Sequence, residues 1–511
     1  MTLVRSPHFH STKRKQMFGP RWSRITAGGV LLAAGMLAAW YAATSAGGNE
    51  DYYEAIRLEG ARIGWAHTER VTVREDGQKL VRTRNESQIT LARAGQKSVQ
   101  KMVLTCWETS DGKLVRFTWE QDRTATAEGS VENGQLTVTR ATRGRSETET
   151  HPWRDWGGYF APQDSLRRDP LQPGEKRVVR SLSPITNTAA NTRLDAIGWE
   201  DVEIDGSKQK LLKIRGLHGV GQQEIETLMW VDRAGQPLRT VVPFLRQESI
   251  RTTKADALRP AETKEFDLLR DTVVKLPGPP PDFALVERVV YLARLKSGTI
   301  DGVFSSGASQ RAMKQDEHST RLEVIALRPD TPLSKATGSE EAAGPDDLAP
   351  TTFLQSDDAE VQTIASSVAA DETNPWQVAV ALEKHIRQAI RTKGYSQAFL
   401  SAADVARSLE GDCTEHAVLL AACLKARKIP ARVAFGLVYV PSLEGFAYHM
   451  WTEAWIDDRW LPLDATQARG GIGCDHIKVG HSRLQGGEAN ADILRVIAVF
   501  GQLELTIVEA E

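Results

Sequence analysis

The stretch Gly411-Asp412-Cys413-Thr414-Glu415-His416 opens an apolar run that continues through Ala417-Val418-Leu419-Leu420-Ala421-Ala422. This run predicts a buried helix that starts at Cys413 and stops before Ile429-Pro430. A cysteine at a helix start faces the positive end of the helix dipole, which favours the thiolate. We therefore expect Cys413 to be a thiol nucleophile with a lowered pKa. Cys423, deeper in the same helix, is expected to be a small buried side chain.

A thiol nucleophile needs a base, and the base needs an acceptor that orients it. His449 lies in Tyr448-His449-Met450-Trp451, and Asp464 directly follows Trp460-Leu461-Pro462-Leu463. Strands predicted at 446–456 and 460–463, joined by a tight turn, would bring His449 and Asp464 side by side. The pattern predicts a triad of Cys413, His449 and Asp464. His416, one helical turn after Cys413, is a rival base that spacing leaves open.

These segments resemble the transglutaminase-like core shared by transglutaminases, peptide:N-glycanases and many exported bacterial proteins. The resemblance covers about 350–511 and also rests on Lys428-Ile429-Pro430-Ala431-Arg432. It implies a papain-related α+β fold in which Cys413, His449 and Asp464 occupy the triad positions. Lys428 and Ala465 depart from the usual glycine and proline, at positions that flank the chemistry without supplying it.

The resemblance further implies an amide or peptide acyl group carried as a thioester on Cys413. Water would make the protein a peptidase or amidase, and an amine would make it a transglutaminase. We favour hydrolysis of a peptide or protein substrate, because the exported bacterial relatives resemble peptidases. The alternative is a non-catalytic cell-envelope binding or scaffold protein that retained the domain.

Two further site hypotheses concern the oxyanion and metals. The backbone N–H of Cys413 is one oxyanion donor, and Gln397 is a candidate for the second because papain-like enzymes place a glutamine upstream. The alternative, which we favour, is that Gln397 is a solvated polar side chain. Cys474-Asp475-His476 could form a metal site with Cys413, but the spacing fits no zinc pattern. No Asp-x-Asp-x-Asp-Gly calcium loop occurs, so we expect no cofactor and no metal.

The N-terminal 46 residues have the pattern of a membrane anchor. Residues 1–24 form a basic leader, and residues 25–46 contain no charge. About 20 helical residues span a bilayer core, and a basic flank stays in the cytoplasm. We expect a single-pass protein with its bulk in the periplasm or cell envelope. A cleaved signal peptide is the alternative, because Ala43, Ser45 and Ala46 offer small residues for cleavage.

The chain between the predicted anchor and the transglutaminase-like domain has the sequence pattern of β-strands. Residues 51–258 contain the turn pairs Asp76-Gly77, Asp111-Gly112, Asn133-Gly134 and Asp205-Gly206, which predict a large antiparallel β domain. A connecting β segment at 259–330 and a linker at 331–350 precede the domain at 351–511. The predicted fold class is therefore α+β: a transmembrane helix, a large antiparallel region and a transglutaminase-like domain.

Charge and cysteine content argue against two other classes, nucleic-acid-binding proteins and disulfide-rich proteins. The chain has 64 Lys and Arg against 66 Asp and Glu, a net charge of -2 that gives no reason to expect nucleic acid. Its four cysteines form no C-x-x-C pair and are too few for a disulfide scaffold.

Overall fold

The computed structural model describes residues 49–511 apart from several gaps. The residues left out are 1–48, 94–95, 123–124, 143, 221–222, 263–272, 297–298, 328–330, 332–339, 392–399 and 487–501. The predicted anchor at 25–46 and the oxyanion candidate Gln397 lie outside the described residues. Among the residues that are described, no helix has both the length and the apolar character needed to cross a bilayer.

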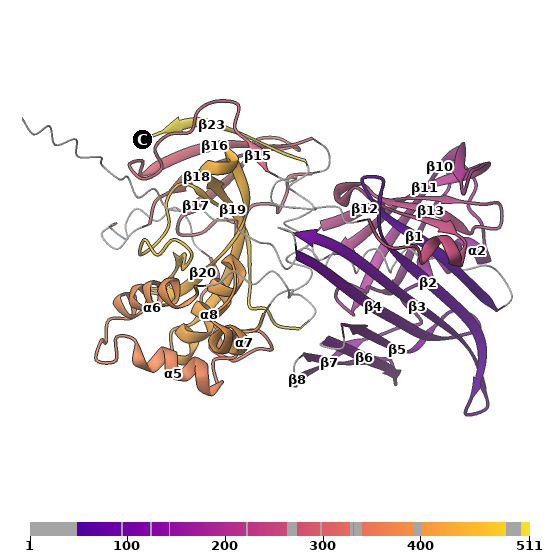
Figure 1. Ribbon diagram of the computed structural model, residues 1–511, viewed down its shortest axis with the longest axis horizontal. Helices are drawn as coiled ribbons and strands as arrows, with labels where there is room; N and C mark the ends of the chain where they lie inside the picture. The colour runs from indigo at the N-terminus through magenta and orange to yellow at the C-terminus, as the bar shows by residue number, and fades with distance from the viewer. Residues whose placement is uncertain are drawn as a thin grey trace, which may run out of the picture.

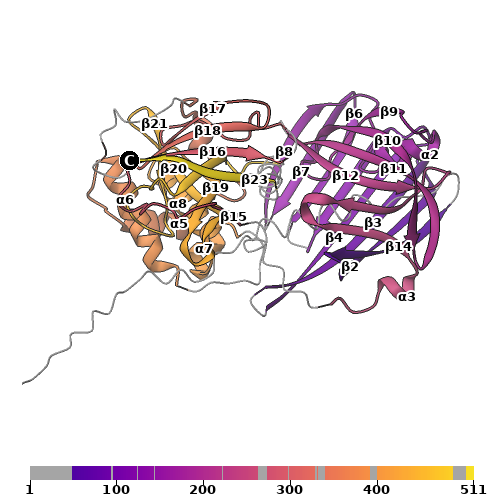
Figure 2. The same ribbon diagram turned by 90° about the horizontal axis from the view of Figure 1, so that it is seen from above.

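The first half of the chain is a 14-stranded antiparallel sheet in the order β8-β7-β6-β5-β4-β3-β2-β1-β14-β13-β12-β11-β10-β9. Its strands are β1 (Glu50–Leu58), β2 (Ala61–Glu75), β3 (Gln78–Arg93), β4 (Gln96–Thr109), β5 (Leu114–Gln121), β6 (Ala125–Glu132), β7 (Gln135–Thr142), β8 (Arg145–Pro152), β9 (Lys176–Leu182), β10 (Ala189–Ile204), β11 (Ser207–Val220), β12 (Gln223–Val231), β13 (Pro237–Val242) and β14 (Gln247–Thr252). Among the described residues, strands that are consecutive in the chain pair with one another, except β8 and β9, which form the two edges of the sheet. The β1–β14 pairing joins the first and last strands of the region. The sheet is strongly curved (Figures 1 and 2).

The Asx-Gly pairs set the hairpins of this sheet, as predicted. Asp76 and Gly77 have φ angles of 47° and 77°, and Asn133-Gly134 and Asp205-Gly206 have the same left-handed pattern. Two positive φ angles in a two-residue turn match the twist of the flanking strands. Asp111-Gly112 also lies in the turn of a hairpin, between β4 and β5, but only Gly112 has a positive φ angle. The described part of this region also contains three short helical segments: α2 (Ala161–Arg168), η1 (Pro243–Leu245) and α3 (Lys254–Ala257).

The second half is an α+β body built on a central five-stranded sheet in the order β15-β20-β19-β22, with β21 on β20. These strands are β15 (Val274–Lys275), β19 (Ala431–Val440), β20 (Gly445–Ile456), β21 (Arg459–Leu463) and β22 (His476–Ser482). The helices are α5 (Ala359–Ser367), α6 (Pro375–Ala389), α7 (Ala402–Ser408) and α8 (Cys413–Ala426), with the short turns η3 (Pro345–Asp347) and η4 (Pro441–Leu443). In Figure 1 the four helices gather at the bottom of the left-hand body.

A second sheet of four strands lies at the top of the same body (Figure 1). It joins β16 (Arg288–Leu295), β17 (Gln310–Lys314) and β18 (Ser319–Ile325) to β23 (Leu503–Ala510). The Tyr291 hydroxyl donates to the Cys474 carbonyl at 2.7 Å, and Gln310 Nε2 donates to the Lys478 carbonyl at 2.7 Å. The segment at 259–330 therefore packs directly against the strand that carries His476.

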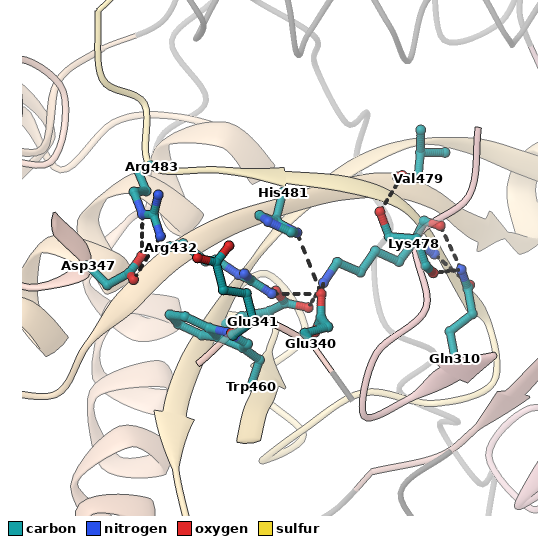
Figure 3. Close-up of polar contacts among 12 residues, drawn as sticks. Gln310, Glu340, Glu341, Asp347, Arg432, Trp460, Lys478, Val479, His481 and Arg483 are labelled. Atoms are coloured by element: carbon teal, nitrogen blue, oxygen red, sulfur yellow. Dashed lines mark hydrogen bonds and ion pairs between the residues drawn. The ribbon is translucent and has the colours of Figure 1, made fainter. Parts of the chain in front are cut away.

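A network of charged side chains holds the linker at Glu340 (Figure 3). Glu340 Oε1 accepts from Arg432 Nη2 and from Lys478 Nζ, both at 2.8 Å. The same two cations pair with Glu453 at 2.8 and 2.6 Å. Buried charges are tolerated when each has a close partner of opposite sign. The network thus fastens the middle of the linker, at Glu340, to Arg432 of β19 and Lys478 of β22, which both pair with Glu453 of β20.

Candidate active site

Helix α8 begins at Cys413 because the preceding residue caps it. The Asp412 side chain accepts the Thr414 N–H at 2.9 Å, and the Glu415 side chain accepts the Asp412 N–H at 2.9 Å. This reciprocal pair is a capping box, which satisfies two of the N–H groups that a helix start leaves open. Cys413 therefore sits at the first helical position, as predicted, with only 2% of its surface exposed.

The electrostatics of the Cys413 thiol differ from the prediction. Burial raises the pKa of Cys413 well above its ordinary value, and the Asp412 carboxylate raises it further. A hydrogen bond from the Met450 backbone opposes the shift, whereas Glu415 and Asp464 add to it. The pKa of Cys413 is therefore raised, not lowered as predicted, chiefly because burial disfavours the thiolate and secondly because the Asp412 carboxylate does so too. The resting group is a thiol, so its activation depends on a base.

The hairpin of β20 and β21 brings His449 to Asp464. Its turn residues Asp457 and Asp458 have φ angles of 51° and 58°, which is the two-residue turn predicted there. Leu463, the last residue of β21, pairs with Thr452, so Asp464 follows directly beside the His449 end of β20. His449 Nε2 donates to Asp464 Oδ2 at 2.9 Å, and both side chains are completely buried.

The second ring nitrogen of His449 is left for another partner. Nδ1 is buried and makes no hydrogen bond among the described residues. Because Nε2 carries the proton donated to Asp464, Nδ1 of the neutral ring has a lone pair. Helix α8 packs on β20, where the Thr452 hydroxyl donates to the Ala417 carbonyl at 3.0 Å. The Met450 backbone hydrogen bond places the Cys413 sulfur beside the residue that follows His449.

Asp464 has more partners than the sequence indicated. Oδ1 accepts from the Thr466 hydroxyl at 2.5 Å and from the Thr466 N–H at 2.8 Å. Oδ2 also accepts from Nε2 of His476 at 3.2 Å. Burial disfavours the charged carboxylate, but His449 and then His476 hold the pKa of Asp464 well below its usual range. His476 was visible in the sequence only as part of a rejected metal pattern.

Glu383 on α6 is the other group that the sequence did not reveal. Its Oε1 accepts the Asp464 N–H at 3.0 Å, and its Oε2 accepts the Gly470 N–H at 2.8 Å. The carboxyl thereby holds both ends of the loop that presents Asp464. Burial, together with the charge of Asp464, raises the pKa of Glu383 to about 8, so it is mainly protonated at neutral pH.

Two further positions that the sequence singled out, His416 and Lys428, lie on or next to α8. His416 is buried, which lowers its pKa to about 4, and its Nδ1 donates to the Asp412 carbonyl at 2.6 Å. The ring is therefore neutral, and its Nδ1 is engaged with a backbone carbonyl. Lys428 follows the end of α8 with φ 63°, the left-handed conformation that glycine adopts without strain. This conformation fits the glycine that the resemblance places at this position.

Two groups of described side chains lie close enough together to ligate a metal ion: His449, Asp464 and His476, and Glu340, Glu453 and His481. In the first group, both Nε2 atoms already donate to Asp464. In the second group, Arg432 and Lys478 pair with both carboxylates. Each group is thus already linked by hydrogen bonds or ion pairs among the described residues.

Comparison with known proteins identifies one region. Residues 362–465 match the model of the transglutaminase-like superfamily. A comparison with curated proteins returns no match for this sequence.

Three solved structures are similar in part. A candidate cysteine protease from Cytophaga hutchinsonii shares 16% identity over 44% of this chain and 92% of its own, with a TM-score of 0.28. A β-barrel-like protein from Brucella abortus shares 12% identity over 40% and 98%, with a TM-score of 0.30. A candidate protease from Parabacteroides distasonis shares 10% identity over 77% and 70%, with a TM-score of 0.20. The C-terminal third of this chain carries a transglutaminase-like domain.

Proposed function

We propose that the C-terminal domain is a thiol enzyme that cleaves an amide or peptide bond through a thioester on Cys413. The observation that carries the proposal is the state of His449, whose Nε2 is held by Asp464 while Nδ1 makes no hydrogen bond. A base oriented in this way can take the proton of a thiol on the adjoining helix. The superfamily match at 362–465 supports the same chemistry.

The proposed reaction has two halves. As Cys413 Sγ attacks the carbonyl carbon, His449 Nδ1 takes the thiol proton, which the raised pKa of the thiol requires. His449 then gives that proton to the leaving amine, the C–N bond breaks and the thioester remains. Water attacks the thioester with His449 again as base, which releases the acid and restores the thiol. Asp464 keeps the imidazole in the reactive tautomer and stabilises its charge.

Turnover with and without an added amine tests the proposal. The full chain would be incubated with a library of blocked peptide amides, in the presence and absence of hydroxylamine. Hydrolysis by the wild type and none by Cys413→Ala supports a peptidase or amidase. Hydroxamate as the main product would instead support acyl transfer. Equal turnover by wild type and Cys413→Ala would contradict the proposal and favour a binding or scaffold protein.

We also propose that residues 25–46 anchor the protein in a membrane with the remainder exported. The support is the uncharged segment behind a basic leader. A protease added to intact spheroplasts should then digest the bulk of the chain. Full protection of the chain until the cells are lysed would contradict this topology.

A further inference from the structure

Asp464 is held by four donors that converge on its two oxygens. His449 and His476 both donate to Oδ2, and the backbone and hydroxyl of Thr466 both donate to Oδ1. The carboxylate and both imidazoles are completely buried. Rotation of Asp464 away from His449 would therefore break bonds that no water could replace.

His476 is itself fixed from two sides. Its Nδ1 donates to Asp475 Oδ1 at 2.9 Å, and Asp475 Oδ2 accepts from Arg469 at 3.1 Å. Its ring meets the edge of Trp451 at 5.5 Å between centroids, at an angle of 89°. His476 opens β22, where it pairs with Val438 of β19. The ring is thus part of the rigid sheet, whereas Asp464 lies in a loop.

From this geometry we propose that His476 is a positioning residue for the base: it anchors the Asp464 carboxylate to the central sheet and shares its charge with His449. The inference rests on the proposed thiol chemistry. In this arrangement the Asp464 carboxylate orients His449, while the second imidazole, His476, offsets part of the carboxylate's charge.

The protonation of His476 follows from its contacts. Each ring nitrogen faces a carboxylate oxygen, so both nitrogens donate only if the ring carries two protons. Burial disfavours that cation, but Asp475 and the hydrogen bonds to both carboxylates raise the pKa of His476 to about 9. His476 is therefore cationic at neutral pH, with its centroid 5.6 Å from that of His449. The other titratable groups around this pair, reached through Asp464 and Asp475, are Glu383 on α6, Cys413 and His416 on α8, Arg469 in the loop and Tyr291 on β16.

Removing this cation takes a positive charge away from the surroundings of the candidate triad. At an effective dielectric constant of about 20, a unit charge about 5.6 Å away moves a titration by about two pH units, and a more distant charge moves it less. The thiolate is the form of Cys413 that is alkylated, and a nearby cation favours it. In His476→Gln the inflection in the rate of Cys413 alkylation should therefore move about one unit toward higher pH. A merely structural role for His476 would not move the inflection.

The test uses the full chain and needs no known substrate. Cys413 alkylation by iodoacetamide is followed by mass spectrometry across pH in wild type, His476→Gln and Asp475→Asn. His481→Gln, an exposed histidine on the same strand, is the matched control. We expect upward shifts in His476→Gln and Asp475→Asn and none in His481→Gln. Circular dichroism confirms that each variant is folded.

Turnover provides a second readout on a peptide amide that the wild type cleaves. His476→Ala should lower kcat on the order of ten- to a hundredfold with KM nearly unchanged, because a charge-assisted bond to Asp464 is lost. His476→Gln, which keeps one donor, should lose less. If His476→Ala does not fold, the pH at which the Cys413 alkylation rate of His476→Gln has its inflection decides whether the inference holds.

Three outcomes would overturn the inference. The first is an unmoved inflection in folded His476→Gln, and the second is wild-type kcat in folded His476→Ala. The third is loss of wild-type activity on dialysis against a chelator, which would indicate that His449, Asp464 and His476 are metal ligands. If Cys413→Ala retains turnover, the proposed function fails instead. If Cys413→Ala is inactive but the His476 variants match wild type, only the positioning role fails.

Discussion

Glu383→Gln tests the electrostatics of the loop that presents Asp464. The pKa of Glu383 is raised from its ordinary value of 4.5 to about 8 in the folded chain, chiefly by burial. Between these two pH values the folded protein binds one more proton here than the unfolded chain. The free energy of unfolding therefore falls as pH rises through this window. Glutamine has nearly the same shape and cannot ionise, so the variant should lack this contribution.

The magnitude follows from the shift. One pKa unit corresponds to 1.36 kcal/mol, so Glu383 should weaken the fold by about 3 kcal/mol between pH 5 and pH 8. Glutamine can accept only one of the two N–H groups from Asp464 and Gly470. The lost bond costs about 1 to 3 kcal/mol at every pH. Glu383→Gln should thus be less stable than wild type at pH 5 and equal or more stable at pH 8.

Urea unfolding followed by far-UV circular dichroism measures this difference. The helix signal reports mainly the C-terminal body, because α5 to α8 lie there. Subtracting wild type from variant at each pH removes every group that the two chains share. The exposed Glu410→Gln is the matched control and should show no pH-dependent difference. A Glu383→Gln difference that stays constant from pH 5 to pH 8 would refute the raised pKa and the loop electrostatics built on it.

Three further predictions concern the candidate site. Asp464→Asn should lower turnover on the order of ten- to a thousandfold, less than the roughly 10⁴-fold loss in a serine-protease triad, and unchanged turnover in the folded variant would contradict its role. His416→Ala should lose little activity because its ring is engaged with a backbone carbonyl, and an inactive His416→Ala beside an active His449→Ala would show that the base is misassigned. Cys413 should alkylate in the native chain at a rate that keeps rising with pH above about 8.5, whereas Cys423, completely buried and with its pKa raised to about 12, should react only on unfolding. Equal native reactivity of both thiols, measured by mass spectrometry, would count against the assignment.

Local sequence signals predicted local structure well. Asx-Gly pairs located the hairpins, and Asn374 before Pro375 marked the start of α6, where its side chain accepts the Trp376 and Gln377 N–H groups. The meeting of His449 and Asp464 was also predictable, because one two-residue turn joins their strands. These features depend on residues that are close in the chain.

Long-range features were not predictable from the same signals. Glu383 is 81 residues before Asp464, and no periodicity links a helical carboxyl to a backbone N–H at that distance. His476 is placed by the pairing of β22 with β19, and no local signal in the sequence predicts that pairing. The pKa of Cys413 was predicted in the wrong direction because the helix dipole was considered without the burial of the thiol and the charge of Asp412. The order in which strands pair and the sum of the charges around a side chain can be read only from the folded structure.

The central claim, a thioester on Cys413, is tested most directly by trapping it. Full-length wild type and Cys413→Ala would each be mixed with a blocked peptide amide, quenched in acid within the first turnover and mapped by mass spectrometry. We predict an acyl adduct on the peptide that contains Cys413, which hydroxylamine removes, and no adduct in Cys413→Ala. An adduct on another residue, or amide cleavage that continues in Cys413→Ala, would contradict the account.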